Sequence, residues 1–232
     1  MFHDWEMMDY VLEPPLQPSL PVFDSTARFP VRRIFCVGRN YADHGIEMGG
    51  DPEREPPFFF AKPADAIVPS GQTIAYPPAT EDLHYEGELV VAIGLGGANI
   101  AVDQAMTHVW GYAAGNDLTR RDLQAEAKAT RRPWDMAKGF DHSAIVGLIH
   151  RQAALADGML TLVVDGVMRQ STLLSKMIWD VPGIIAHLSR LVTLAPGDLI
   201  FTGTPAGVGA LQRGQTCSVT IGGLSPAIVT IT

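Results

Sequence analysis

The chain has 232 residues and carries 17 basic against 25 acidic side chains, a formal net charge of −8. This balance argues against non-specific binding to nucleic acid or to an anionic membrane surface. The two cysteines, Cys36 and Cys217, show no CxxC or Cys/His spacing, which excludes a disulfide framework and a thiolate zinc site. No apolar run approaches the roughly 18 residues of a membrane span, and the N-terminus does not resemble a secretory signal. We therefore expect a cytoplasmic protein with no membrane partner.

Residues 1–30 are predicted to form a Pro-rich arm, followed by a single domain over 31–232. The five prolines after residue 13 of this arm oppose both a helix and a central strand. Such an arm is either a partly ordered tail or an extended segment that lies over the body or over a partner subunit.

The rest of the chain alternates short apolar runs with turn residues. Strands are predicted over 31–38, 58–60, 89–93, 111–115 and 199–201, hairpins over 160–169 and 217–232, and helices over 40–48, 102–110, 119–129 and 181–191. Asp165-Gly166 indicates a type I′ hairpin turn, and Thr119 with Asp122 fits a helix-capping pattern. Many short strands with few helices indicate a β-rich α+β fold rather than repeated βαβ units.

Three acidic residues lie beside predicted buried strands. Glu86 and Glu88 precede the apolar strand 89–93, and on one strand their side chains would share a face about 6–7 Å apart. Asp117 follows a Gly-rich strand. The glutamates could instead be solvated at an exposed strand end, and Asp117 could serve as a helix cap or turn residue. If the three meet, carboxylates without a cysteine partner favour a hard cation such as Mg²⁺ or Mn²⁺.

Two further features suggest chemistry. His44 and Glu47 lie three residues apart, so on a helical turn the carboxylate could orient the imidazole as a base. A surface contact is the alternative, although the Gly/Pro-rich stretch over 43–57 is typical of a mobile flap. Lys62 and Lys138, two of only four lysines, follow apolar runs; each either has a partner or extends its amine to solvent.

Taken together and in order, these segments resemble the fumarylacetoacetate hydrolase family from about Val31 to the C-terminus. The resemblance rests on six blocks: Gly38–His44, Phe60–Pro63, His84–Leu89, Gly111–Tyr112 with Asn116–Gln124, Ala137–Phe140 and Thr202–Gly209. Within the family, the amino-acid sequence over 31–41 and 55–66 is similar to that of the bacterial fumarylpyruvate hydrolase branch.

The resemblance implies a mixed β-sandwich roll, a homodimer, and Mg²⁺ or Mn²⁺ held by Glu86, Glu88 and Asp117. It also implies a water-activating pair at His44 and Glu47, a catalytic lysine at Lys138, and substrate contacts at Arg39, Gln124 and Thr204. The expected reaction is hydrolytic C–C cleavage of a 1,3-diketo acid such as fumarylpyruvate. Alternatives that use the same site are oxaloacetate decarboxylation and the isomerisation or dehydration of a related acid, and a non-catalytic alternative is a structural ion.

Overall fold

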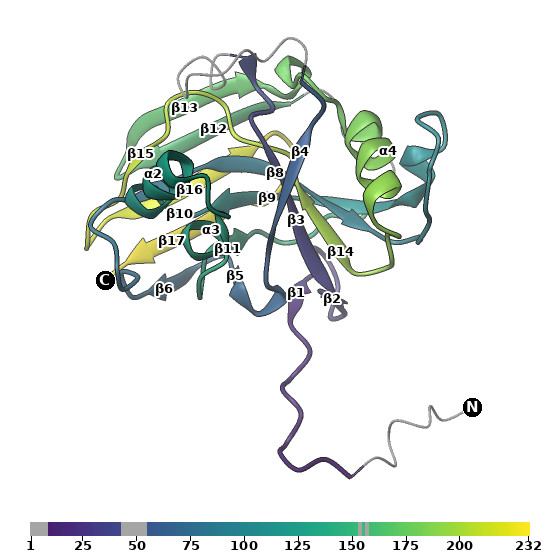
Figure 1. Ribbon diagram of the computed structural model, residues 1–232, viewed down its shortest axis with the longest axis horizontal. Coiled ribbons are helices and arrows are strands. Elements are labelled where there is room, and N and C mark those ends of the chain that lie inside the picture. The colour runs from purple at the N-terminus through teal and green to yellow at the C-terminus, as the bar shows by residue number, and fades with distance from the viewer. Residues whose placement is uncertain (1–8, 43–54, 153–154, 156–157) are drawn as a thin grey trace.

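Two β-sheets packed face to face form the body of the molecule in the computed structural model, which describes residues 9–42, 55–152, 155 and 158–232 (Figure 1). The larger sheet has the strand order β4-β3-β14-β8-β9-β11-β5 and the second has the order β13-β12-β16-β17-β6. Two small sheets, β1-β2 and β10-β7-β15, flank them. The β-rich α+β class predicted from the sequence is confirmed.

The strands of the larger sheet are β3 (Arg33–Gly38), β4 (Phe58–Lys62), β5 (Ile67–Pro69), β8 (Gly87–Ile93), β9 (Val109–Asp117), β11 (Ala144–Val146) and β14 (Asp198–Phe201). The second sheet contains β6 (Gln72–Ile74), β12 (Met159–Val164), β13 (Val167–Leu173), β16 (Thr216–Ile221) and β17 (Ala227–Ile231). The small sheets contain β1 (Ser19–Pro21), β2 (Arg28–Pro30), β7 (Leu83–Tyr85), β10 (Thr119–Arg120) and β15 (Gly209–Ala210).

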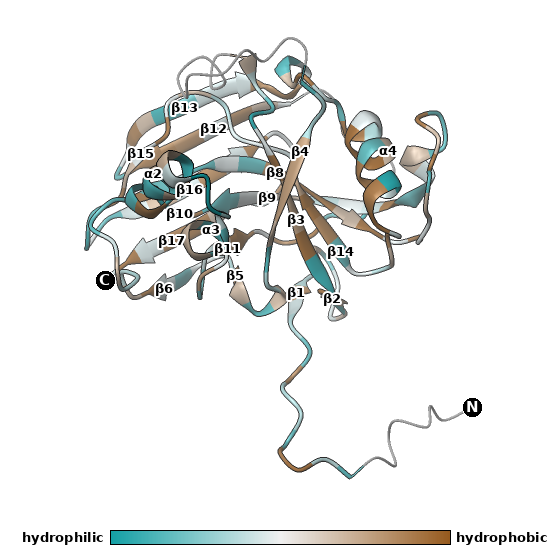
Figure 2. Cartoon of the chain, viewed as in Figure 1, coloured by the Kyte–Doolittle hydropathy of each residue, from teal (hydrophilic) through white to brown (hydrophobic). Residues whose placement is uncertain are grey.

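Strand β8 lies at the centre of the core and is buried along its whole length. Successive side chains of a strand point to opposite faces. Leu89 and Val91 accordingly join the core shared with the second sheet, whereas Val90 and Ala92 join a second cluster on the other face. Burial on both faces explains the continuous apolar run over 89–93. Figure 2 shows similar apolar stretches, in brown, along β3, β4 and β14 of the same sheet.

The N-terminal residues divide into two parts. Strands β1 and β2 pair through Leu20 and Phe29, both of which are buried in the second cluster. Residues 9–17, in contrast, leave the body as an extended segment (Figure 1). Residues 19–30 of the predicted arm therefore form a hairpin against the body, and the domain boundary at residue 30 stays a prediction.

Helices are few in the described part of the chain: α2 (Arg121–Thr130), α3 (Asp135–Lys138), α4 (Val181–Leu191) and the short 3₁₀ turns η2 (Ala64–Ala66), η3 (Ala105–His108) and η4 (Leu174–Lys176). Helix α4 has the predicted bounds, and the Asp180 carboxylate caps it by accepting from the Gly183 N–H at 2.9 Å. None of the described helices is long and apolar enough to cross a membrane.

Two local predictions are wrong. The helix predicted over 102–110 is only the 3₁₀ turn η3, because Val109 already pairs with Ile93 of β8 as the start of β9. Thr119 does not cap a helix: it lies in β10, α2 starts at Arg121, and the Thr119 hydroxyl accepts from the Lys138 amine at 2.6 Å. The type I′ turn, in contrast, is confirmed, since Asp165 and Gly166 both have positive φ values of 47° and 80°.

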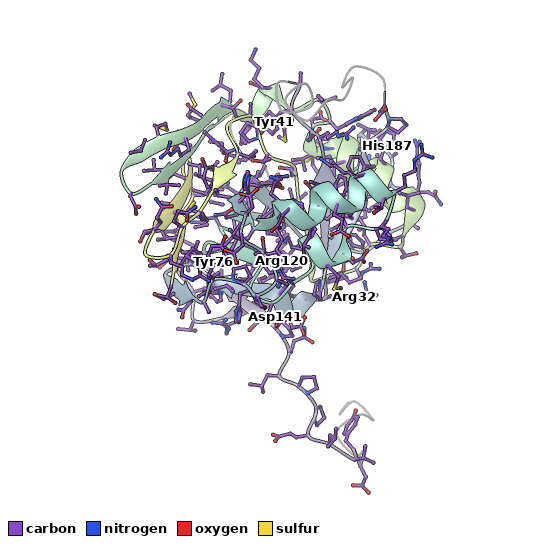
Figure 3. The ribbon with its side chains drawn as sticks, turned by 60° about the vertical axis from the view of Figure 1, so that its left-hand side comes forward. Arg32, Tyr41, Tyr76, Arg120, Asp141 and His187 are labelled. Atoms are coloured by element: carbon purple, nitrogen blue, oxygen red, sulfur yellow. The ribbon has the colours of Figure 1, made fainter. Side chains whose placement is uncertain are left out.

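A buried carboxylate ties β14 to its parallel neighbour β3. Asp198 is fully buried and accepts from Arg33 Nη2 at 2.7 Å, from Arg32 Nη1 at 3.2 Å and from the Ala195 N–H at 2.9 Å. Arg32, labelled in Figure 3, lies at the surface end of this network. The arginine side chains are 49% and 33% exposed, so both could regain water if the carboxylate were lost.

Replacing Asp198 by alanine should therefore destabilise the fold by about 1–3 kcal/mol, mainly through the unpaired Ala195 N–H and the lost charge-assisted bonds. Thermal unfolding should show a melting temperature several degrees lower, at about 2–4 °C per kcal/mol for a chain of this size. The control is Asp103→Ala, which removes an exposed aspartate and should change stability by less than about 0.5 kcal/mol. Equal melting temperatures for the two variants would contradict this role of Asp198.

Candidate metal centre and active site

The three predicted acids meet where β8 and β9 lie side by side. Glu88 belongs to β8, Asp117 is the last residue of β9, and Glu86 stands between β7 and β8. Pairing of Gly87 with Asn116 brings Glu86 next to Asp117, whose N–H donates to the Glu86 carbonyl at 2.8 Å. All three side chains are buried, and each offers a carboxylate oxygen within 4.8 Å of the others. The alternative of solvated glutamates is excluded.

Three cations surround this acidic triad of Glu86, Glu88 and Asp117. The Lys138 amine donates to Glu86 Oε2 at 2.7 Å and to Asp117 Oδ2 at 2.8 Å. Lys62 lies 2.7 Å from Asp117 Oδ1, and Arg121 forms an ion pair with Glu86 Oε1. The two lysines are therefore buried partners of the triad and do not extend to solvent.

The charges of the triad depend on one another. Burial raises the pKa of Glu88 well above its usual value, and the charges of Asp117 and Glu86 raise it further. The Lys138 amine and the Gly203 N–H, which donates to Glu88 at 2.7 Å, lower this pKa but do not outweigh the rise. Burial alone would lower the pKa of Lys138, but the carboxylates of Asp117 and Glu86 prevail and raise it. Lys138 is therefore charged at neutral pH, and added positive charge near Glu88 would favour its ionised form.

The donor set fits a divalent metal ion. Three carboxylates converge, and no cysteine or histidine belongs to the cluster within the described residues. Such an all-oxygen set suits Mg²⁺ or Mn²⁺, which accept carboxylates and water as ligands. A dication would also oppose the rise in the pKa of Glu88 that burial and the neighbouring carboxylates cause.

A pocket beside the triad contains the predicted substrate contacts. Its lining includes Arg39, Gln124 and Thr204 together with Glu86 and Lys138. The predicted pair His44 and Glu47, and most of the flap predicted over 43–57, lie outside the described residues. Their roles stay predictions.

Each of the three contact residues has a donor available for a ligand. The buried Arg39 Nε has no hydrogen-bond partner among the residues that the structure describes. Gln124 Oε1 accepts from Arg121 Nη1 at 2.6 Å, which leaves its amide N–H groups as donors. The Thr204 hydroxyl accepts from Gln170 Nε2 at 2.9 Å, so its own proton can point elsewhere.

Backbone strain supports a functional role for Arg39. Its φ of 58° lies in the left-handed region, which costs free energy for a residue with a side chain. The preceding Gly38 is required for a different reason, since a Cβ there would lie 2.0 Å from the Phe58 ring. The strand end of β3 is thus shaped to admit an aromatic ring and to turn an arginine into the pocket.

Part of the pocket wall is aromatic. Phe58, Phe60 and Trp134 line it, and the Trp134 ring meets the Phe58 ring edge-on at a centroid distance of 5.3 Å. Helix α2 lies across this region, and Arg120, labelled in Figure 3, joins its start to α3 by donating to the Met136 carbonyl at 3.2 Å. The pocket therefore combines a charged end at the triad with an apolar wall.

Comparison with known proteins agrees with this geometry. The family model described as fumarylacetoacetate (FAA) hydrolase C-terminal matches residues 33–232. The chain belongs to the fumarylacetoacetate hydrolase family. Membership makes the protein an enzyme, and the fold and the resemblance expected from the sequence are confirmed.

Several family members are similar over most of their length. A fumarylpyruvate hydrolase from Ralstonia sp is 43% identical over 183 residues, 78% of this chain and 95% of that protein. A mitochondrial oxaloacetate tautomerase from Arabidopsis thaliana is 41% identical, over 83% of this chain and 87% of that protein. The crystal structure of fumarylpyruvate hydrolase from Pseudomonas aeruginosa in complex with Mn²⁺ and pyruvate superposes with a TM-score of 0.94 at 48% identity, covering 97% and 99% of the two chains.

The fold also brings in residues that sequence reasoning missed. Arg121 binds the triad, and Gln170 joins the two sides of the pocket: its Oε1 accepts from the Gly87 N–H at 2.9 Å while its Nε2 donates to Thr204. Arg121, Gln124 and Lys128 are spaced i, i+3, i+7 and so share one face of α2. Because Gln124 was a predicted substrate contact, this spacing could have indicated that Arg121 and Lys128 face the same pocket.

Proposed function

We propose that this family member is a metal-dependent hydrolase that cleaves the C–C bond of a 1,3-diketo acid, with fumarylpyruvate as the substrate and fumarate and pyruvate as the products. The observation that carries the proposal is a buried carboxylate triad opening onto a pocket with several positively charged donors. The similar crystal structure that contains Mn²⁺ and pyruvate supports it. By family resemblance we also infer a homodimer that works in the cytoplasm on a gentisate-type aromatic pathway.

In this proposal Glu86, Glu88 and Asp117 hold Mg²⁺ or Mn²⁺. The bound ion supplies Lewis acidity at the 2-oxo acid end of the substrate, where negative charge develops. The three cations Lys62, Lys138 and Arg121 balance the three carboxylates, so the loaded site carries a net positive charge. Such a site attracts an anionic 2-oxo acid.

The protein side chains then divide the proton transfers and the positioning. His44, oriented by Glu47, takes a proton from water, and the hydroxyl adds to the distal carbonyl carbon. The bond between this carbon and the pyruvate methylene breaks, its electron pair stays on the pyruvate part, and protonation there gives pyruvate. Lys138 and the Gln124 amide stabilise developing negative charge. Arg39 and the Thr204 hydroxyl position the remaining oxygens.

The second candidate is an oxaloacetate decarboxylase or a 2-oxo-diacid isomerase. A related oxaloacetate tautomerase at 41% identity favours it, and these reactions need the same acidic triad but no attacking water. The His44 and Glu47 pair in the sequence favours hydrolysis over these reactions.

A substrate panel tests the proposal. The 232-residue chain, loaded with Mg²⁺ or Mn²⁺, is assayed with fumarylpyruvate, maleylpyruvate, acetylpyruvate and oxaloacetate, and kcat/KM is compared. The highest kcat/KM is expected for fumarylpyruvate, with stoichiometric pyruvate release. A higher value for oxaloacetate, or no cleavage of any acylpyruvate, would overturn the proposal.

A further inference from the structure

One cation in the pocket has no part in the proposed chemistry. Lys128 lines the pocket from the last turn of α2, and its amine lies over the Trp134 ring, 5.3 Å from the centroid. Among the described residues it has no carboxylate at ion-pair distance. A partly buried lysine that lines a pocket, with no ion-pair partner in the described part of the chain, is a candidate for binding an anionic ligand group.

Its place along α2 separates Lys128 from the residue of this helix that binds the triad. Arg121, which binds Glu86, and Gln124 lie on the same face of the helix as Lys128. With a rise of 1.5 Å per residue, Lys128 stands about 6 Å beyond Gln124 and about 10 Å beyond Arg121 along the axis. A diketo acid bound by its 2-oxo acid end at the triad, with a four-carbon unsaturated acyl group, spans a similar length.

The wall between these two ends suits such an acyl chain. Phe60 and Trp134 line the pocket and connect its two ends. The Lys138 amine lies 5.0 Å from the centroid of the Phe60 ring, which lies 5.9 Å from that of Trp134, the ring beneath the Lys128 amine. Flat aromatic surfaces pack well against a planar, unsaturated carbon chain. The pocket therefore offers a charged end, an apolar middle and a second, cationic end.

We propose that Lys128 binds the distal carboxylate of a dicarboxylic substrate and selects it over diketo acids with a neutral tail. The inference rests on the proposed function and deepens it. It assigns Lys128 to substrate specificity, whereas the triad and its neighbours carry the reaction that is common to all diketo acids.

The electrostatic surroundings agree with this role. Burial, then the nearby cations Arg121 and Arg39, lower the pKa of Lys128 to about 8; Lys138 also lowers it, and Glu86 raises it. The amine is thus largely charged at neutral pH, and a bound carboxylate would favour the charged form. Since only the charged amine binds the carboxylate, KM for a dicarboxylic substrate should rise as the pH increases through about 8.

The test compares Lys128→Met with the wild type on two substrates. For fumarylpyruvate, kcat/KM should fall by about 10- to 100-fold, mainly through KM, because one charge-assisted bond is lost. For acetylpyruvate, which has no distal carboxylate, it should change by less than about 3-fold, and the rise in KM near pH 8 should disappear from the variant. The matched control is Arg190→Met, which removes an exposed cation from the last turn of α4 and should leave both substrates unaffected.

A binding measurement separates this inference from the proposed function. Calorimetry on the Mg²⁺-loaded wild type should show tighter binding of fumarate than of crotonate, which replaces one carboxylate by a methyl group, and Lys128→Met should lose that preference. An equal loss on both substrates, or an unchanged preference for fumarate, would overturn the role of Lys128. Failure of the wild type to cleave any acylpyruvate would overturn the proposed hydrolase instead, and the fumarate preference would still decide the role of Lys128.

Discussion

Replacing Glu88 by glutamine is expected to lower kcat by at least about 10³-fold, which corresponds to about 4 kcal/mol of transition-state stabilisation. The substitution removes one of three buried carboxylates that can hold the metal ion, without a change in side-chain size. Glutamine still offers an oxygen to the Gly203 N–H, so the fold should be retained. Activity, metal affinity by calorimetry and thermal unfolding are the measurements.

Two comparisons make this prediction specific. Glu126→Gln removes an exposed acid from α2 and should leave metal affinity and kcat unchanged. Removal of the metal ion from the wild type by a chelator should abolish activity. The melting temperature should fall only by the stabilisation that binding of the ion to the folded state provides. A Glu88→Gln variant that binds metal and turns over normally would contradict the assignment, and a chelated enzyme that unfolds outright would indicate a structural ion.

The second large effect is expected at His44. His44→Ala should lower kcat by about 10²- to 10⁴-fold, the range of a lost general base, while metal affinity stays at the wild-type value. The control is His142→Asn, at an exposed histidine whose φ of 62° asparagine tolerates. An unchanged kcat in His44→Ala would exclude the base, and loss of metal binding in that variant would indicate a different role.

Sequence predictions were correct where a structure depends on residues close together in the chain, and they were wrong where it depends on a distant residue. The Asp165-Gly166 turn and the bounds of α4 were predictable because they are determined locally: the turn depends on its own two residues, and α4 starts where the Asp180 side chain accepts from Gly183 three residues on. The hydroxyl of Thr119 could accept a hydrogen bond either from a backbone N–H at the start of the helix or from a distant side chain. In the fold it accepts from the Lys138 amine, which is 19 residues away. Local patterns cannot weigh such a competition.

The same difference between local and distant interactions explains which residues of the site could be predicted. The carboxylates were predictable because acids next to a buried strand are unusual, and all three come together. The spacing of Glu86 and Glu88 on one strand was only an approximation, since Glu86 lies just before β8 and reaches Asp117 through the β8–β9 pairing. Gln170 was missed because nothing near it in the sequence indicates Thr204 as its partner. Arg121 shares a helix face with Gln124, but that spacing alone does not indicate that its partner is Glu86.

Helix α2 has a consequence for how this enzyme could diversify. The acidic triad comes from strand ends in the core, whereas Arg121, Gln124 and Lys128 come from one face of a ten-residue helix. With Lys128 in the proposed role, substitutions there would alter which acyl tail is accepted and would leave the sheets and the acidic triad intact. Directed evolution toward new diketo acids should accordingly accumulate changes in the second half of α2 and around Trp134, and spare the ends of β8 and β9.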